Sequence, residues 1–368
     1  MDKIKKNFGF GCMRLKMNGE DVDYEEFNKM IDTFLDAGFN YFDTAHGYIS
    51  GKSETAIRDC LAARHPRESF ILTNKLSPGF FETREEIRPL IDSQLNLCGV
   101  EYFDFLLMHA MNNARFDFYQ QVGAFEEALA LKAEGKIRHM GISFHDKAAV
   151  LDRILTERPD IEVVQIQFNY LDFEDATVES RKCYEVCRKH GKPVIIMEPV
   201  KGGTLANMSQ DAVDIYKELG SMSPASYAVR YAAGFEGVMM VLSGMGSMEM
   251  MHDNLSYMKD FKPLNETELE AVAKVTKILL DQNQIPCTGC RYCVDGCPAG
   301  IHIPDLFTAL NAKRSLRDPN ADAMYQQVLD NGSAKASACV KCGKCEDSCP
   351  QNLEIRKLLE VNVRFFER

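Results

Sequence analysis

Eight of the thirteen cysteines fall into two runs of identical spacing, and these runs constrain the chain more than any other feature. Both runs follow the pattern C-x2-C-x2-C-x3-C-P, and they read CTGCRYCVDGCP and CVKCGKCEDSCP. Thiolates at this spacing on a turning loop can reach three corners of one cubane, while the fourth cysteine, beside proline, ligates the other cluster. The sequence therefore predicts two 4Fe–4S clusters.

We assign the eight thiolates by this crossed pattern, which is that of bacterial ferredoxins. Zinc is a weaker interpretation, because it takes cysteines in paired C-x2-C form and needs no third cysteine at this spacing. Disulfides would need an oxidising compartment. One cluster takes Cys287, Cys290, Cys293 and Cys349, and the other takes Cys339, Cys342, Cys345 and Cys297.

The repeat extends beyond the cysteines. Residues 287–307 align with 339–359 at a constant offset, so that Ile303 matches Ile355 and both runs lead into an apolar helical start. Two helical stretches between the runs end near Pro319 and Gly332. A compact ferredoxin has a shorter, strand-forming link, so this segment resembles the α-helical ferredoxins found in iron–sulfur subunits of respiratory reductases.

Length and charge bound the remaining possibilities. A chain of 368 residues should hold two domains, which we place at 1–262 and 263–368. The net charge of −11 argues against nucleic acid and against an anionic membrane surface as partners. No apolar run approaches the ~20 residues that span a bilayer, and the N-terminus lacks the apolar stretch of a secretory signal. We therefore expect a cytoplasmic protein.

The first 260 residues alternate apolar strand-like runs with amphipathic helical stretches. This alternation predicts an α/β fold, a (β/α)8 TIM barrel followed by the small α-helical ferredoxin-like domain. Helices are expected at 24–37, 83–98, 116–134 and 174–190, each closed by a glycine, and at 264–281 after the barrel. The strand-like runs are 7–12, 39–43, 69–75, 102–109, 136–143, 163–170, 192–198 and 237–244.

Four polar residues stand at or just after predicted strand ends, where TIM barrels carry their chemistry. Asp43 ends the second strand and Tyr48 follows it, while Lys75 and His109 end the third and fourth. Lys75, held by Asp43, is expected to lower the pKa of Tyr48 so that its hydroxyl can donate a proton. His109 is expected to hydrogen-bond and polarise a substrate carbonyl.

Asp43, Tyr48, Lys75 and His109 occur in the same sequence order as the four active-site residues of the aldo-keto reductase family, which residues 1–260 resemble. The runs FGFGCMRL, GISF, VVQIQFNY, EPVKGG and LSGM…DNL match it as well. The whole chain resembles the subgroup of that family with a C-terminal ferredoxin-like domain. The resemblance implies NADH or NADPH across the barrel mouth, with Ser143 and Gln165 at the carboxamide. The other implied contacts are Gly11, Cys12, Met13, Met197, Val200, Gly244, Met245, Asp253 and Asn254.

The sequence departs from the family pattern at the dinucleotide. Phe144 stands where the family often has Asn, and Met197 where an aromatic residue commonly stacks on the nicotinamide. Gly244 and Met250 stand where basic residues commonly grip a 2′-phosphate. We therefore expect weak discrimination between NADH and NADPH, or a preference for NADH.

The favoured hypothesis is nicotinamide-linked reduction of a carbonyl, or the reverse alcohol oxidation, with electron transfer through both clusters. A hydride carries two electrons whereas a cluster passes one, so a flavin is a candidate go-between, although no flavin motif is present. A ferredoxin or flavodoxin-like carrier is a further candidate partner. Two alternatives remain, a reductase whose clusters are structural and an electron-transfer or docking protein whose barrel is not catalytic. His46 and His145 either line the barrel mouth or are exposed loop residues.

Overall fold

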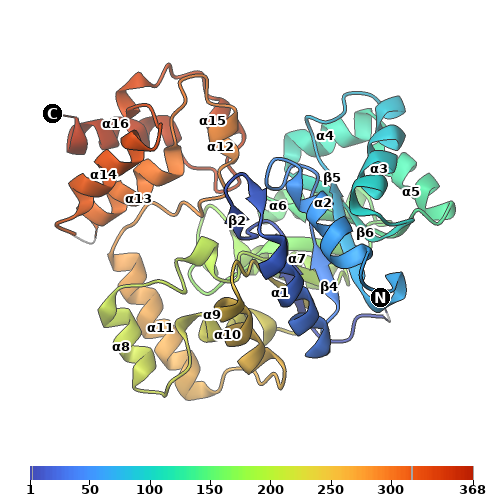
Figure 1. The fold of residues 1–368 in the computed structure, drawn as a ribbon, viewed down its shortest axis with the longest axis horizontal. Coiled ribbons are helices and arrows are strands. Elements are labelled where there is room, and N and C mark those ends of the chain that lie inside the picture. The colour runs from blue at the N-terminus through green and yellow to red at the C-terminus, as the bar shows by residue number, and fades with distance from the viewer. Residues whose placement is uncertain (2, 316–317, 368) are drawn as a thin grey trace. The chain divides into compact units, whose positions relative to one another are not determined.

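The computed structural model describes residues 1, 3–315 and 318–367. The chain forms two compact units (Figure 1). The first unit comprises Met1–Pro199 and Ala225–Asn265, and the second comprises Val200–Pro224 and Glu266–Arg368. A segment from the middle of the chain thus joins the C-terminal region in the second unit.

The first unit is a closed barrel of parallel strands in the order β1-β10-β9-β8-β7-β6-β5-β4. The predicted TIM barrel is confirmed, since each predicted strand-like run overlaps one of these strands. A short hairpin of β2 (Met17–Asn18) and β3 (Asp21–Val22) was not predicted. The barrel strands are β1 (Phe8–Gly11), β4 (Tyr41–Asp43), β5 (Ile71–Leu76), β6 (Phe103–Met111), β7 (Ile137–Phe144), β8 (Val163–Gln167), β9 (Val194–Met197) and β10 (Val238–Ser243).

Helices cover the outside of the barrel (Figure 1). The glycines predicted to close helices, Gly38, Gly99, Gly135 and Gly191, all have positive φ and end their helices as expected. The helices of this unit are α1 (Tyr24–Asp36), α2 (Lys52–Ile57), α3 (Arg84–Cys98), α4 (Asn113–Gln121), α5 (Ala124–Ala133), α6 (Ala148–Glu157), α7 (Ser180–Lys189), α9 (Pro224–Ala233) and α10 (Met248–Met258).

Two predicted helices were wrong in extent. The helix expected at 116–134 is divided into α4 and α5, because Gly123 adopts a left-handed conformation with φ of 67°. The helix expected at 174–190 begins only at Ser180. The side chain of Asp175 accepts hydrogen bonds from the backbone amides of residues 177 and 178, and this local turn replaces the first helical turns.

An apolar cluster drawn from six strands fills part of the barrel. Packing there is tight enough to require glycine, since a Cβ at Gly141 would lie 2.5 Å from the Val163 side chain and 2.7 Å from that of Leu107. The filled barrel is a rigid support for polar groups at the strand ends. The cluster consists of Tyr41, Ile71, Phe105, Leu107, Val163, Ile195, Met240 and Leu242.

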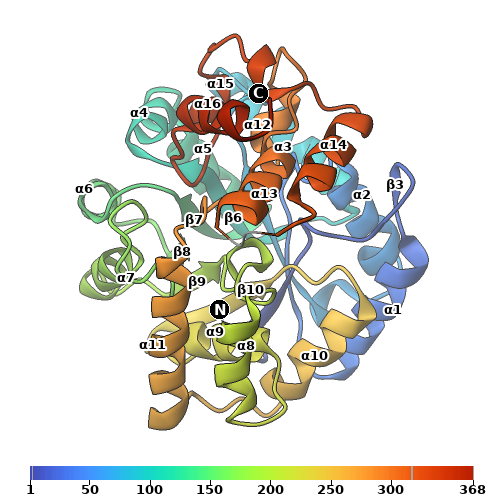
Figure 2. The ribbon, with the colours of Figure 1, turned by 90° about the vertical axis from the view of Figure 1, so that its left-hand side faces the viewer.

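The second unit is helical, as the sequence predicted (Figure 2). Its own apolar core includes Leu306, Phe307 and Leu359. The internal repeat is also present in the structure. Helix α12 corresponds to α15 and helix α13 corresponds to α16, and both pairs are separated by the offset that aligns the two cysteine runs. Helix α11 packs on α8. The helices are α8 (Gln210–Lys217), α11 (Glu266–Asp281), α12 (Tyr292–Asp295), α13 (Ile303–Arg314), α14 (Ala321–Asp330), α15 (Lys344–Asp347) and α16 (Ile355–Phe366). Over the described ranges of both units, none of the helices combines the length and apolar character that a bilayer crossing requires.

Candidate active site and iron–sulfur sites

A buried ammonium group organises the carboxyl ends of β4 and β5. Lys75 Nζ lies 2.6 Å from Asp43 Oδ1, 2.9 Å from the Thr44 carbonyl oxygen and 3.1 Å from Tyr48 Oη. These three acceptors match the three N–H bonds of an ammonium group. The Lys75 side chain is 1% exposed, and a charge so buried is tolerated only when it is paired and hydrogen-bonded. The structure thus brings Asp43, Tyr48 and Lys75 together.

His109, near the end of β6, lies beside them. Its ring centroid is 6.1 Å from that of Tyr48, and its Nδ1 lies 2.6 Å from Ser77 Oγ. Burial, and then the charge of Lys75, hold the pKa of His109 well below its ordinary value. The imidazole is therefore neutral at neutral pH. If Nδ1 accepts from Ser77, the ring proton is on Nε2 and available to a substrate.

A turned backbone fixes the direction of His109. Ala110 has a φ of 54°, in the left-handed region that residues other than glycine rarely adopt. The Arg115 guanidinium donates to the Ala110 carbonyl at 2.7 Å, and Tyr119 Oη lies 3.1 Å from the carbonyl oxygen of His109. Ser77, Arg115 and Tyr119 were missed by the sequence analysis, because nothing in their spacing marks them.

A buried polar network lies behind Lys75 and was also missed. The fully buried Glu54 carboxylate accepts from Asn74 Nδ2 at 2.8 Å and from Gln94 Nε2 at 3.2 Å. Gln94 also donates to the Lys75 carbonyl at 3.0 Å. The other Glu54 oxygen lies 2.7 Å from His46 Nδ1, and this contact fixes the orientation of the imidazole. The His46 side chain is partly buried.

Several residues implied for the dinucleotide end barrel strands as expected. Ser143 on β7 pairs in register with Gln165 on β8, and both are 1% exposed. Gln165 Nε2 donates to Asp43 Oδ2 at 3.2 Å, so it is tied to the tetrad of Asp43, Tyr48, Lys75 and His109. Cys12 is buried after Gly11, and burial raises the pKa of its thiol. Met13 follows, while Met197 ends β9 and Val200 lies in the second unit.

The loop after β10 contains Gly244 and Met245 and leads into α10. Ser243 Oγ donates to Asn254 Oδ1 at 2.7 Å, while Asp253 is the residue next to Asn254 on the helix. The first amide of α10, that of Met248, donates to the Glu26 carboxylate at 3.0 Å. An acidic side chain of the protein therefore occupies part of this helix N-terminus, where a phosphate would otherwise be favoured.

A basic side chain reaches this loop from another part of the chain. A Cβ placed on Gly244 would lie 3.3 Å from Arg14 Cδ, so the Arg14 side chain lies against the loop. The Arg14 guanidinium is 3.9 Å from the Glu198 carboxylate, and its side chain is 34% exposed. Met250, where the family commonly has a basic residue, is exposed. The sequence analysis did not find Arg14, because the β1 loop and the β10 loop are distant in sequence.

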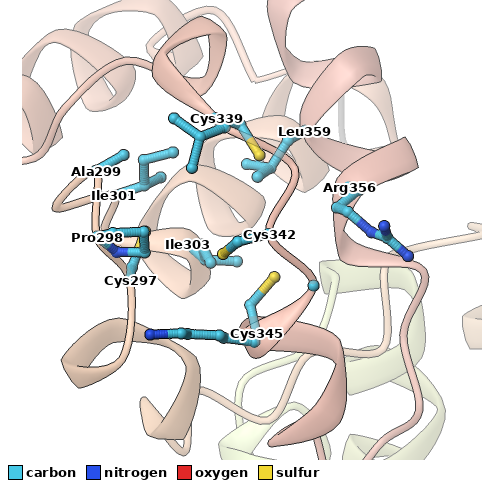
Figure 3. A pocket seen from close by; sticks show the side chains of 13 residues that line it. Cys297, Pro298, Ala299, Ile301, Ile303, Cys339, Cys342, Cys345, Arg356 and Leu359 are labelled. Carbon is cyan, nitrogen blue, oxygen red and sulfur yellow. The ribbon is translucent and has the colours of Figure 1, made fainter.

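One cavity of the second unit is lined by four cysteines from both runs. It encloses about 330 Å³, including space open to solvent, and Figure 3 shows the cysteine side chains around it. In the described part of the chain, no three His, Cys, Asp or Glu side chains are placed to hold one metal ion. A 4Fe–4S cluster differs from a single metal ion, because each of its four irons binds one thiolate. Four thiols placed around a cavity are therefore suited to such a cluster. The four are Cys297, Cys339, Cys342 and Cys345, the set assigned to one cluster from spacing.

The remaining thiols are close to one another as well. Burial, and then the neighbouring Cys290, Cys287 and Cys349, raise the pKa of Cys293 to about 12. Among the cysteines around the cavity, burial likewise raises the pKa of Cys345 to about 11, with contributions from Glu346 and Cys339. Buried, clustered thiols stay protonated unless a positive centre compensates the thiolate charge, and iron provides that centre.

The fold and these two sites define a class, a TIM-barrel oxidoreductase with an added iron–sulfur region. Residues 7–277 match the model of the aldo/keto reductase family, and residues 286–353 match that of a 4Fe-4S dicluster domain. The chain belongs to the aldo/keto reductase family and carries a C-terminal 4Fe–4S dicluster domain.

Individual relatives agree with this assignment. The uncharacterized oxidoreductase YqkF of Bacillus subtilis is 23% identical over 73% of this chain and 92% of its own. L-galactose dehydrogenase of Arabidopsis thaliana is 26% identical over 74% and 89%.

Solved structures share the barrel fold. Aldo-keto reductase AKR11C1 from Bacillus halodurans, in its holo form, aligns with a TM-score of 0.60 at 23% identity, over 74% of this chain and 92% of its own. An aldo-keto reductase from Klebsiella pneumoniae in complex with NADPH aligns with a TM-score of 0.60 at 19% identity, over 74% and 95%. At these identities the likeness concerns the fold alone.

Proposed function

We propose that the protein is an iron–sulfur oxidoreductase that reduces the carbonyl group of a small molecule, or oxidises the corresponding alcohol, with NADH or NADPH. The observation that carries the proposal is the buried Lys75 ammonium, which donates to both Asp43 and Tyr48. This is the arrangement that a tyrosine proton donor needs, and it lies at the strand ends where barrel enzymes act.

The residues divide the work as follows. The Lys75 charge stabilises the phenolate form of Tyr48, which lets the hydroxyl give its proton to the carbonyl oxygen. Asp43 holds Lys75 in place and offsets its charge. His109 stays neutral and donates a hydrogen bond to the same oxygen. The alcohol oxidation uses the same groups in reverse, with Tyr48 receiving the proton.

A nicotinamide dinucleotide would supply the two electrons as hydride. Ser143 and Gln165 are the side chains that we assign to its carboxamide, because they are adjacent in register at the mouth. Arg14 and the loop after β10 would hold its phosphates. Support also comes from the barrel relative from Klebsiella pneumoniae, whose structure contains NADPH.

The two clusters would pass single electrons to or from a protein carrier, with a ferredoxin or flavodoxin-like protein as the candidate. Exchange with the nicotinamide would take two such electrons for each hydride, with a flavin as the candidate go-between. Of the cysteines around the cavity, Cys342 is exposed, and the neighbouring Val340 side chain is 65% exposed. One edge of that cluster would therefore be accessible to a carrier. The clusters would also be structural, because most of the cysteines pack against the core of the second unit.

Anaerobically purified protein tests the proposal. We expect NADH or NADPH to be oxidised by simple aldehydes, and dithionite-reduced clusters to be reoxidised by an added ferredoxin. Bleaching of the cluster absorbance by NADPH alone would show that the centres are connected, with or without a flavin in the extracted cofactors. Absence of aldehyde reduction, with clusters and dinucleotide bound, would contradict the barrel chemistry.

A further inference from the structure

A partly buried arginine lies next to the tetrad without a counter-charge. Arg115, in the first turn of α4, donates to the Ala110 carbonyl at 2.7 Å, one residue after His109. Within the described ranges, no carboxylate lies within ion-pair distance of its guanidinium. The carboxylate of Asp146 is in the same region, but its oxygens accept from the backbone amides of Asn113 at 2.9 Å and Lys147 at 2.8 Å.

A second polar group in this region lacks a partner. The backbone amide of His145 donates to the Met111 carbonyl at 2.8 Å, which places it beside the end of β6, just before the helix α4 that carries Arg115. Its Nε2 lies 3.4 Å from Ser143 Oγ, while its buried Nδ1 has no hydrogen-bond partner among the described residues. Burial, followed by the charges of Arg115 and Lys75, lowers the pKa of His145 to about 4. His145 is therefore a neutral imidazole close to two cations.

An anionic ligand would complete both groups, because it would pair with the guanidinium and accept a hydrogen bond from the imidazole. A partly buried guanidinium gains from a counter-ion, and a buried ring nitrogen without a hydrogen bond is costly. The planar guanidinium matches the two oxygens of a carboxylate. Because Arg115 contacts the residue next to His109, the complementary anion would belong to the molecule whose carbonyl His109 contacts.

We propose that Arg115 binds a carboxylate of the substrate, and that the substrate is an oxo acid. The inference rests on the proposed function, because it names the substrate class of that site. A phosphate in place of the carboxylate is less well matched, since a dianion requires more donors than one guanidinium and one imidazole.

Matched aldehydes test the inference. 4-Oxobutanoate and butanal differ by a carboxylate in place of a methyl group. We expect the wild type to favour 4-oxobutanoate in kcat/KM by ten- to a hundredfold. Arg115→Met should bring this ratio to within about twofold, while Arg115→Lys should retain part of it. Arg153→Met is the matched control, because Arg153 is paired with Asp117 and Glu157 on the outside, and it should leave the ratio unchanged. A wild-type ratio near one would overturn the inference.

A binding measurement separates this inference from the proposed function. Calorimetric titration should show that benzoate binds and benzamide does not, and that benzoate binding is lost in Arg115→Met but kept in Tyr48→Phe. Failure of aldehyde turnover with this pattern intact would reject the reaction and keep the anion site. Benzoate binding that survives in Arg115→Met, or that is absent from the wild type, would reject the anion site. Iron content and thermal unfolding establish that each variant is folded.

Discussion

The barrel site and the cluster sites of this protein are built in opposite ways. In the barrel, the chain supplies the partners of its own reactive groups, as Asp43, Thr44 and Tyr48 do for Lys75. In the second unit, cysteines from both runs surround a cavity, and burial raises the pKa of thiols such as Cys293 and Cys345. The barrel site is therefore held together by the chain's own side chains, whereas the cysteine sites are completed by iron.

The first prediction tests the crossed cluster assignment and has the largest expected effect. The double variant Cys297→Ala, Cys345→Ala removes two ligands of one cluster, so about four of the expected eight irons should remain. The matched variant Cys293→Ala, Cys345→Ala has the same number of substitutions but should lose both clusters. Iron and sulfide analysis of anaerobic protein distinguishes them. Equal iron in the two variants would mean that the pairing is wrong.

The second prediction concerns the barrel, where loss of function should leave the structure intact. Tyr48→Phe removes the proposed proton donor but keeps the ring, so carbonyl reduction should fall by roughly 10²–10⁴-fold, with cluster content and dinucleotide binding nearly unchanged. Tyr24→Phe is the control, since its hydroxyl bonds to Asp59 on the surface. Steady-state kinetics of both variants measure the effect. Near-normal turnover in Tyr48→Phe would show that the proton has another source.

The third prediction tests how strongly the loop after β9 holds the cluster-binding segment of the second unit. Gly202 has a φ of 62°, and a Cβ there would lie 2.3 Å from the carbonyl oxygen of Thr288, between two predicted ligands. Gly203 also has a positive φ, but a Cβ there would meet no atom closer than 3.7 Å. Gly202→Ala should therefore destabilise the second unit by about 1–3 kcal/mol more than Gly203→Ala does. Denaturant unfolding monitored by cluster absorbance measures this, and equal midpoints would contradict the contact.

Much of this organisation was predictable because it is local in sequence. The strand-like runs predicted the barrel, and the residues at their ends predicted that Asp43, Tyr48 and Lys75 would meet. The cysteine spacing predicted which thiols share a cavity, because a repeated ligand pattern encodes its own geometry.

The missed features depend on contacts between distant segments. Glu54, as a single acidic residue in a helix, gives no sign that it is fully buried beneath Lys75. Arg115 became notable only when the fold showed it to lack an ionic partner among the described residues. The membership of Val200–Pro224 in the second unit follows from packing against the C-terminal region, which no local pattern records.

The fourth prediction uses pH to compare the two kinds of site. The folded-state pKa of His145 is about 4 and its unfolded value about 6.5. Between these values the unfolded chain binds a proton that the folded chain does not. The contribution of His145 to the free energy of unfolding is therefore complete above pH 6.5. It is lost as the pH falls towards 4, by at most about 1.4 kcal/mol per pH unit. Denaturant unfolding of the barrel in His145→Asn should show a shallower loss than the wild type over this range. Parallel curves would contradict a neutral, buried His145.

The last prediction concerns Arg14 and has the smallest effect. Basic residues are missing at Gly244 and Met250, but the Arg14 side chain lies against Gly244, so its guanidinium can replace them at a 2′-phosphate. Arg14→Met should weaken NADPH binding about tenfold, the value of one charge-assisted hydrogen bond, and change NADH binding by less than twofold. Lys16→Met is the control, because Lys16 pairs with Asp23. Fluorescence titration of the reduced dinucleotides measures both affinities. Equal losses for the two would place Arg14 at the pyrophosphate, and no loss for either would leave the weak discrimination expected from the sequence.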